Sequence, residues 1–275
     1  MRAKQSTIVF AAATLATLCG CAPLERLTTL SDRARHASFA RSKDRDSPYL
    51  AAAVCQAYVV FSGDWKSEKP SVDPQSRVII VPVTADKKLP SRGLAIALES
   101  DGYLLTVSHV LGRTNFVFGE FAGRLDVRPA RVVFRSDKDY SEVALIKVES
   151  KLDHCAAYGD TPKPGDQAYA VVAYRGKKRA DVVLDFAAGT VLKVKEYPSG
   201  SPVLSLGTDV PLWHGDSGGP LFSSTGRLIG VNTGCKFDWY WYGVYWKYQG
   251  SSLFPKQRFI ESLIARDRAS HLGVR

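Results

Sequence analysis

The segment whose residues most clearly suggest a catalytic role is a glycine-rich stretch around a serine, Gly215-Asp-Ser-Gly-Gly-Pro220. A serine hydroxyl is a weak nucleophile unless an adjacent base takes its proton. It attacks a carbonyl carbon, and the negative charge that develops on the carbonyl oxygen needs hydrogen-bond donors already in place. Glycine on both sides lets the backbone curl so that the N–H groups of Gly215 and Ser217 can point to one spot. The segment therefore predicts a nucleophile with an oxyanion hole, although by itself it could be an ordinary polar turn.

A histidine elsewhere in the chain should supply the base. His109 directly follows the strand-like run 103–107 and stands at its polar end, where a side chain can reach across a cleft. A lone histidine is more often structural, and the other four have no such context (His36, His154, His214 and His271). His214 is nevertheless near enough to Ser217 along the chain to line the same site.

A carboxylate should orient the imidazole and stabilise its cation. Glu142 stands immediately before the strand-like run 143–148. We expect it to be the acid, because a group directly preceding a strand is held more rigidly than one in a loop. Asp137 and Asp139, in the loop before it, stay open as alternatives.

The elements that must position these side chains are short β-branched runs separated by turn signals. The runs lie at 77–83, 93–98, 103–107, 130–134, 143–148, 168–173, 189–194, 203–206, 220–222 and 228–231. Such spacing without helical periods predicts an all-β sandwich or barrel. From Pro255 on, Phe259, Ile260, Leu263 and Ile264 recur at helical offsets, which predicts a closing helix to about residue 268.

In combination, these features resemble the chymotrypsin clan of serine proteases. The chain order His109, Glu142, Ser217 matches that clan, and three segments are similar to bacterial HtrA (Deg-type) protease domains, namely 101–110, 164–172 and 230–234. The resemblance covers about residues 77–234. Asp216 departs from it, since HtrA enzymes usually have Asn there, and we expect no PDZ-like domain in this chain.

The resemblance implies a fold and a set of roles. We expect two antiparallel β-barrels of the trypsin-like serine protease type, at about 76–150 and 160–250 of a domain spanning 76–268, with a C-terminal helix. Ser217 would attack, His109 would transfer the proton, Glu142 would orient it, and the amides of Gly215 and Ser217 would hold the oxyanion. The expected substrate pocket comprises Pro211, His214, Thr233, Gly234 and Cys235.

The expected reaction is hydrolysis of peptide bonds in protein or peptide substrates, without a metal or an organic cofactor. No carboxylate stands at the pocket floor, so a small or medium apolar residue is expected before the scissile bond rather than Arg or Lys. Two alternatives stay open: a weak or inactive pseudoprotease that binds peptides or acts as a scaffold, and an esterase with the same triad.

The chain start is typical of a secretory leader. Residues 1–20 combine a basic beginning with an apolar stretch too short to span a bilayer. Leu18-Cys-Gly-Cys21 resembles a bacterial lipobox, which would place a lipid on Cys21 and hold the protein at the outer membrane, facing the periplasm. A soluble periplasmic or secreted protein is the alternative. Residues 21–75 are expected to form a tether and an N-terminal arm.

The net charge is +10, and it falls to +8 once Arg2 and Lys4 leave with the leader. Basic residues are scattered among acidic ones, and no nucleic-acid recognition motif accompanies them, so we expect no nucleic-acid partner. The pairing of Cys55, Cys155 and Cys235 stays open, and none of the three stands in a catalytic setting. The aromatic run 237–246 is expected to be core packing at a barrel edge or a stacking rim beside the cleft.

Overall fold

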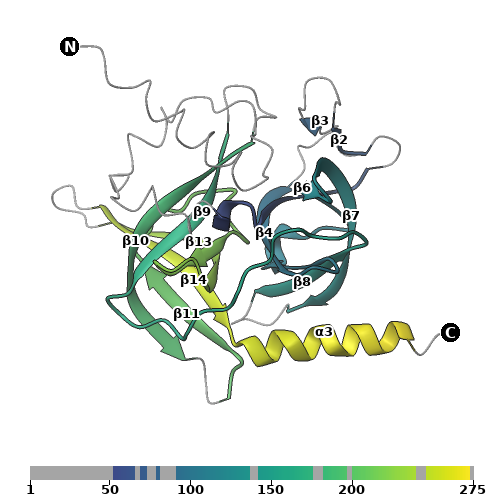
Figure 1. The fold of residues 1–275 in the computed structure, drawn as a ribbon. Helices are drawn as coiled ribbons and strands as arrows, with labels where there is room; N and C mark the ends of the chain where they lie inside the picture. Colours follow the sequence, from purple (N-terminus) through teal and green to yellow (C-terminus); the bar gives the residue numbers. More distant parts are fainter. Residues whose placement is uncertain are drawn as a thin grey trace, which may run out of the picture.

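The computed structural model describes residues 52–65, 69–72, 79–80, 91–136, 142–175, 182–196, 200–239 and 246–272. The predicted leader, Cys21, Asp137 and Asp139 lie outside these ranges, as does most of the predicted tether. The described part contains two closed six-stranded antiparallel barrels and one long helix, α3 (Figure 1). The expected all-β class with a C-terminal helix is confirmed.

Barrel one has the strand order β1-β4-β5-β8-β7-β6. Its strands are β1 (Ala57–Gly63), β4 (Ser91–Glu99), β5 (Tyr103–Val107), β6 (Thr114–Phe121), β7 (Arg124–Arg135) and β8 (Val143–Val148). Beside it, β2 (Ser71–Val72) and β3 (Ile79–Ile80) form a two-stranded sheet. The strand expected at 77–83 is described only where it forms β3.

Strand β1 lies within the stretch that we expected to be an arm outside the barrels. It pairs with β4 on one side and with β6 on the other. Tyr58, Val59, Val60 and Phe61 are all buried, so this strand closes the barrel and contributes to its core. The barrel therefore begins near residue 57 rather than at 76.

Barrel two has the strand order β10-β11-β14-β13-β12-β9. Its strands are β9 (Gln167–Arg175), β10 (Val182–Glu196), β11 (Val203–Thr208), β12 (Pro220–Phe222), β13 (Leu228–Trp239) and β14 (Trp246–Pro255). Strand β12 is short and leaves β13 at Val231, so β13 continues past it with β14 as its neighbour. This step in the sheet lies beside Ser217.

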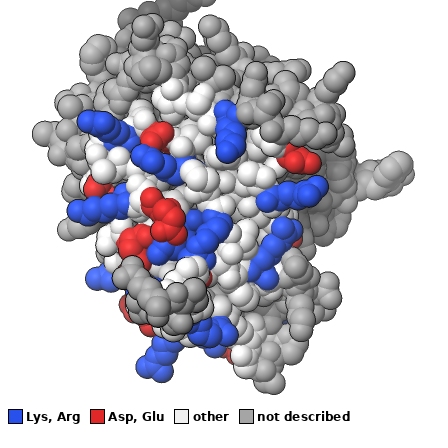
Figure 2. Space-filling model, turned by 90° about the vertical axis from the view of Figure 1, so that its right-hand side faces the viewer, with Lys and Arg blue, Asp and Glu red and all other residues white. Residues whose placement is uncertain are grey.

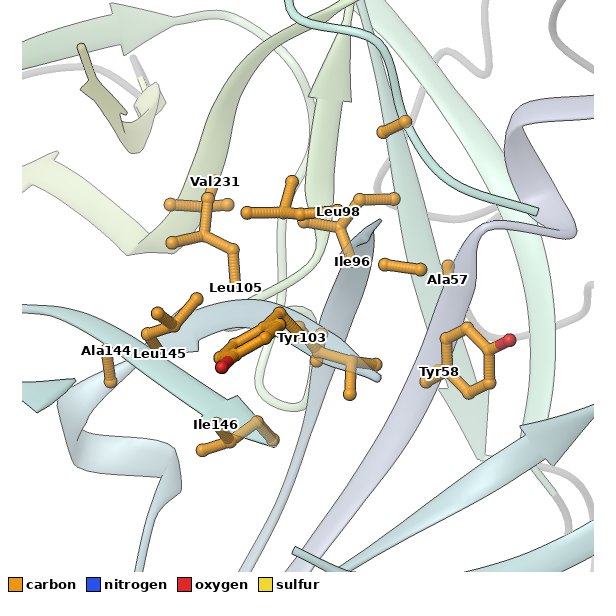
Figure 3. Packing of buried hydrophobic residues seen from close by; sticks show 14 of the residues in the cluster. Ala57, Tyr58, Ile96, Leu98, Tyr103, Leu105, Ala144, Leu145, Ile146 and Val231 are labelled. Atoms are coloured by element: carbon orange, nitrogen blue, oxygen red, sulfur yellow. The ribbon is translucent and has the colours of Figure 1, made fainter. Parts of the chain in front are cut away.

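The two barrels share a hydrophobic core. Val231 from β13 belongs to the same cluster as Leu98 of β4 and Leu105 of β5, and Figure 3 shows these side chains next to one another. Phe222 of barrel two and Tyr103 of barrel one are also fully buried members of the cluster. Because interiors are close-packed, this shared core determines how the barrels are oriented.

Helix α3 (Gln257–Leu272) follows barrel two but packs under barrel one (Figure 1). Its buried face supplies Ile260, Leu263 and Ile264 to the shared core, and the Phe259 ring meets the Phe134 ring edge-on at 5.7 Å. The helix therefore packs the end of the chain against the core that both barrels share.

Asp267 anchors the far end of α3. Its carboxylate accepts two hydrogen bonds from the Arg131 guanidinium, at 2.7 and 2.5 Å, and one from the Tyr103 hydroxyl at 2.7 Å. The hydrogen bonds from Arg131 are the main reason why the pKa of Asp267 falls from its ordinary 3.8 to about 2. Burial of the Tyr103 phenol raises its pKa to about 12.

Charged side chains on the face shown in Figure 2 are interspersed, with basic groups beside acidic ones. Among the described residues, Arg128 and Asp126 form an ion pair at 2.7 Å. On this face, the positive charge is therefore distributed rather than gathered in one patch. Among the described residues, no helix combines the length and apolar character needed to cross a membrane.

The structure narrows the cysteine alternatives. Neither Cys155 nor Cys235 is part of a disulfide. No disulfide therefore joins any two of Cys55, Cys155 and Cys235. Burial raises the pKa of the Cys155 thiol to about 11, so that thiol is a poor nucleophile at neutral pH.

We predict that Asp267→Asn lowers the free energy of unfolding at pH 7 by about 2 kcal/mol, as expected from the depressed pKa. Because the folded-state pKa is below the unfolded value of 3.8, this contribution is complete above about pH 4 and is lost as the pH falls through 2. Urea unfolding at several pH values measures it.

The matched control is Glu149→Gln. Glu149 lies 3.7 Å from the same Arg131 guanidinium, but its side chain is 78% exposed. Such a pair contributes at most about 0.5 kcal/mol. Equal losses in the two variants would contradict the anchoring role of Asp267.

Candidate active site

Ser217 follows a tight turn that only glycine makes easily. The Asp216 N–H donates to the Trp213 carbonyl at 3.0 Å and closes a turn over residues 213–216. Gly215 is the third residue of this turn and has a φ of 101°. A positive φ at that position is typical of a type II turn and favours glycine. We call residues 213–216 the oxyanion turn.

The Asp216 side chain holds the oxyanion turn to barrel two. Its carboxylate is 1% exposed, and it accepts hydrogen bonds from the Trp213 N–H at 2.6 Å and from the Ala173 N–H of β9 at 2.8 Å. Two backbone donors thus stabilise a buried carboxylate. This arrangement explains how Asp can occupy a position where the resembling enzymes usually have Asn.

A second turn follows at residues 216–219, and the Ser217 carbonyl within it bonds to barrel one. The Gly219 N–H donates to the Asp216 carbonyl at 2.9 Å, and Gly218 has a φ of 81°. Across the barrel junction, the Leu94 N–H of β4 donates to the Ser217 carbonyl at 2.8 Å. A Cβ at Gly218 would overlap the Leu94 carbonyl oxygen, so this approach requires glycine.

His109 and Glu142 are brought together by strand register. Strands β5 and β8 pair with Val107 opposite Val143, so the residues just after β5 lie beside those just before β8. His109 lies in the short 3-10 helix η2 (Ser108–Val110), and its Nδ1 is 2.9 Å from Glu142 Oε2. The His109 and Glu142 side chains are 42% and 52% exposed.

Ser108 binds the two segments that carry this pair. Its N–H donates to the Glu142 carbonyl at 2.6 Å, and its hydroxyl donates to the Ser136 carbonyl, also at 2.6 Å. The backbone around Glu142 is thereby fixed against η2. Nothing in the sequence singled out Ser108, because its partners are backbone carbonyls more than 25 residues away.

The Ser217 hydroxyl donates to the Thr233 carbonyl at 3.2 Å. No hydrogen bond joins the two described side chains of Ser217 and His109, so proton transfer between them requires Ser217 Oγ to leave Thr233. Thr233 is the extra residue of a β-bulge between Asn232 and Gly234. Bulges beside active sites commonly re-aim a residue in this way.

Two backbone donors at and beside Ser217 have no partner within the described part of the chain. These are the N–H groups of Gly215 and Ser217, neither of which donates an internal hydrogen bond. Backbone donors in folded proteins are nearly always paired with protein or water. This pair is therefore available to an incoming oxygen.

The expected pocket residues all lie on the barrel-two side of Ser217. His214 is exposed in the oxyanion turn and Pro211 is half-buried before it, while Thr233, Gly234 and Cys235 are half-buried along β13. Leu212, which stands in the segment 211–214 expected to form the pocket, is 2% exposed. Its Cδ1 lies 3.2 Å from the point where a Cβ on Gly250 would be.

Two further side chains lie at the oxyanion turn, that of Trp213 within it and that of Arg92, which the sequence analysis missed. Trp213 is an exposed aromatic at 47%, and its ring is 5.8 Å from that of His214. Arg92 reaches the turn from β4, with a guanidinium nitrogen 3.3 Å from the point where a Cβ on Gly215 would be. Arg92 is more than 120 residues from Gly215 in sequence, so no local pattern could have revealed it. Within the described ranges, no group of three or more His, Cys, Asp or Glu side chains could hold a metal ion.

Comparison with known proteins gives consistent matches. The family model described as a trypsin-like peptidase domain matches residues 93–231. A probable periplasmic serine endoprotease DegP-like of Ectopseudomonas mendocina (strain ymp) is 31% identical over 150 residues, which is 54% of this chain and 30% of the relative. A protein of the same description from Hahella chejuensis (strain KCTC 2396) is 29% identical over 146 residues, covering 52% of this chain and 29% of the relative. The alignments thus span under a third of the length of these curated relatives.

Among solved structures, the HtrA-type protease AlgW with a decapeptide is similar to this chain, with a TM-score of 0.52 and 20% identity. That match covers 79% of this chain and 66% of AlgW. At this level of identity, the likeness concerns the fold.

We predict that Gly218→Ala destabilises the protein by more than about 3 kcal/mol, because a positive φ is combined with overlap against backbone. The matched control is Gly165→Ala, where φ is 96° but nothing lies within 4 Å of the added Cβ. The control should lose only about 1–2 kcal/mol. Thermal or urea unfolding measures both, and equal losses would show that the approach to β4 is not the constraint.

Proposed function

This chain belongs to the family of trypsin-like peptidase domains, and we propose that it is a serine endopeptidase of the cell envelope. The proposal is carried by one observation, the convergence of three features from distant parts of the chain. These are the Ser217 hydroxyl, the two available amides beside it, and the His109–Glu142 pair at 2.9 Å. The segment that carries His109 comes close to Ser217 at Gly93, because Val110 and the Ser217 carbonyl both lie against that glycine. Residues of unrelated segments would not gather in this way by local folding alone.

In the proposed mechanism, Ser217 Oγ attacks the carbonyl carbon of the scissile peptide bond. His109 accepts the hydroxyl proton at Nε2 and later donates it to the leaving amine. Glu142 accepts a hydrogen bond from Nδ1–H, which selects the tautomer with Nε2 available and stabilises the imidazolium. The Gly215 and Ser217 amides stabilise the oxyanion that forms on the substrate.

The substrate backbone is proposed to pair with β13. From Thr233 on, this strand pairs only with β14 within the described part, so its other edge can accept an extended peptide as a further strand. The side chain before the scissile bond would enter the pocket of Pro211, His214, Thr233, Gly234 and Cys235. Leu212 lies against this region, which favours a small or medium apolar residue.

The first prediction concerns the nucleophile. A fluorophosphonate probe should label the wild-type protein and fail to label Ser217→Ala, because the probe reacts with an activated serine hydroxyl. In-gel fluorescence measures this. Equal labelling of both proteins, or of neither, would contradict the proposed chemistry, and absence of labelling with retained peptide binding would support the pseudoprotease alternative.

A second measurement separates a peptidase from an esterase. It compares the hydrolysis of an unstructured protein with the hydrolysis of a simple ester.

The second prediction concerns the acid. Glu142→Gln should lower kcat by about 10²–10⁴-fold, because the amide cannot select the His109 tautomer or stabilise its cation. The lower end reflects the exposure of the pair, 42% and 52%, since water partly replaces the lost carboxylate. Steady-state hydrolysis of a peptide substrate measures kcat. A loss in Asp139→Asn instead of Glu142→Gln would assign the acid to the preceding loop.

The proposed enzyme is held in the envelope by a lipid on Cys21, which lies outside the described residues. The leader pattern of residues 1–20 and the lipobox-like 18–21 support this, as does the word periplasmic in the names of the relatives. We expect radiolabelled palmitate to be incorporated into the wild type but not into Cys21→Ala. Incorporation in neither protein would favour a soluble periplasmic or secreted form.

A further inference from the structure

We propose that a cavity beside the start of α3 binds an alkylammonium group, which is an apolar chain with a primary amine at its end. A lysine side chain and a free amine both carry this group. The inference does not rest on the proposed function, because the cavity lies apart from Ser217 and His109. We call it the α3 cavity.

The α3 cavity is formed by four segments that only the folded chain brings together. They are the end of β4, the segment 156–158 between the barrels, the turn before β13 and the start of α3, and Figure 1 shows α3 beginning below the two barrels. The volume of the cavity is about 250 Å³, which is below the roughly 300–1,000 Å³ of sites for drug-sized ligands. It therefore suits a single side chain or a small amine.

The α3 cavity is separate from the proposed catalytic site. Arg227 lines the cavity and directly precedes β13. The Thr233 carbonyl, which accepts the hydrogen bond of Ser217, lies six residues further along the same strand. At about 3.3 Å per residue, this separation is roughly 20 Å. A small ligand in the cavity therefore does not contact the nucleophile.

The inner wall of the cavity is apolar. Four buried side chains form it, those of Leu98, Ala156, Ile260 and Ile264. The Ala156 N–H donates to the Ala97 carbonyl at 2.8 Å, which holds the segment between the barrels against β4. Such a wall stabilises the methylene groups of a ligand, because it removes them from water.

One polar group of the cavity is buried without an internal partner. The Tyr158 hydroxyl makes no hydrogen bond with any described residue. Tyr158 and Glu261 of α3 both line the cavity, and the charge of Glu261 acts on the Tyr158 phenol, so the hydroxyl lies on the side of α3. A buried hydroxyl that stays unpaired costs free energy. A ligand that forms a hydrogen bond with it removes this cost.

Two carboxylates stand at the rim of the cavity, those of Glu99 and Glu261. Glu99 Oε2 is 3.5 Å from Arg268 Nη2, whereas Asp101 Oδ1 is only 2.9 Å from the same nitrogen. The Glu261 carboxylate accepts a hydrogen bond from the Gln257 amide at 2.8 Å, and a neutral amide does not compensate its charge. An ionised carboxylate has about four acceptor sites, so both groups can also bind a cation.

The charges around the cavity favour a cation over an anion. Burial raises the pKa of the Tyr158 phenol, and the charge of Glu261 raises it further. Burial also raises the pKa of the adjacent Cys155 to about 11, with additional contributions from the carboxylates of Glu99, Asp101 and Asp153. The basic side chain of the wall is that of Arg227, and its Nη1 donates to the Tyr158 carbonyl at 3.1 Å.

These features together match an alkylammonium group. An ammonium has three donors and no acceptor, and the cavity offers two carboxylates and one hydroxyl as acceptors. The apolar chain of the ligand can lie against the buried wall while its charged end stays at the rim, as amphipathic side chains commonly do.

Titration with n-butylamine, which reproduces the end of a lysine side chain, tests the proposal. The wild-type protein should bind it with a Kd of about 1 mM, a reasonable value for five non-hydrogen atoms. The neutral 1-butanol and the anionic butyrate should each bind at least about tenfold more weakly, because they lack the charge-assisted hydrogen bonds. NMR titration at pH 7 measures all three. Equal affinities, or no binding of butylamine, would overturn the proposal.

Three variants of the cavity should weaken the binding of butylamine. Tyr158→Phe should raise Kd about tenfold without lowering the urea midpoint of unfolding, because the hydroxyl that it removes has no internal partner. Glu99→Gln and Glu261→Gln should each raise Kd about two- to fivefold, as expected for partly exposed charges. Unchanged affinity in all three variants would place the amine elsewhere and overturn the proposal.

The matched control is Asp64→Asn. Asp64 is 54% exposed and 3.7 Å from Arg113, which resembles the 44% exposure and the 3.5 Å ion pair of Glu99. It lies near the opposite end of β4, because the end of β1 pairs with the start of that strand. This variant should bind butylamine like the wild type. A loss as large as that of Glu99→Gln would show an effect of net charge and would overturn the site.

A further ligand separates the two sources of the alkylammonium group. If N-acetyl-lysine methylamide binds at least as tightly as butylamine, the cavity takes a lysine side chain of a polypeptide, whereas binding of butylamine alone assigns it to a free amine. None of these titrations requires catalysis. Failure of the fluorophosphonate probe to label Ser217 would therefore overturn the proposed function and leave the α3 cavity unaffected.

Discussion

The arrangement of the site depends on how closely the backbone of residues 215–219 approaches the neighbouring strands. The Ser217 carbonyl is bonded to the Leu94 N–H of β4, and this contact leaves no space for side chains. A Cβ on Gly219 would come within 2.7 Å of the Val171 carbonyl oxygen of β9, and one on Gly218 would overlap β4. Glycine is thus required around Ser217 for two reasons, namely the turn conformation and the close contact with both barrels.

This approach is possible only because the two barrels are held in one orientation. Val231, Leu105 and Tyr103 belong to a single buried cluster that crosses the junction, and α3 adds its apolar face to the same cluster. The Asp267 carboxylate then binds Arg131 and Tyr103 of barrel one. A helix that follows the second barrel in sequence therefore also binds the first barrel.

Some polar groups of the site are buried and others are exposed, and the two kinds have different roles. Asp216 is buried and bonded to two amides, so it maintains the shape of the oxyanion turn. Glu142 and His109 are about half exposed, and their geometry depends on the β5–β8 register and on the Ser108 hydrogen bonds rather than on burial. Structural support and proposed chemistry are therefore carried by separate carboxylates.

The sequence by itself determined the local parts of this protein. Glycine around Ser217 predicted a tight turn, β-branched runs predicted most strands, and the apolar periodicity after Pro255 predicted α3. It placed His109 after one strand and Glu142 before another, because those boundaries are local. The sequence analysis did not predict β6 and β14, because each contains a glycine that resembles a turn signal. Gly119 in β6 is instead required by the Tyr58 ring that lies against it, and Gly250 in β14 by the Val210 carbonyl. Only the tertiary structure decided that β1 closes the first barrel, that Ser217 meets the Thr233 carbonyl, and that Arg92 reaches the oxyanion turn. These contacts join residues that are far apart along the chain, and they form only when strand register and barrel closure bring the segments together.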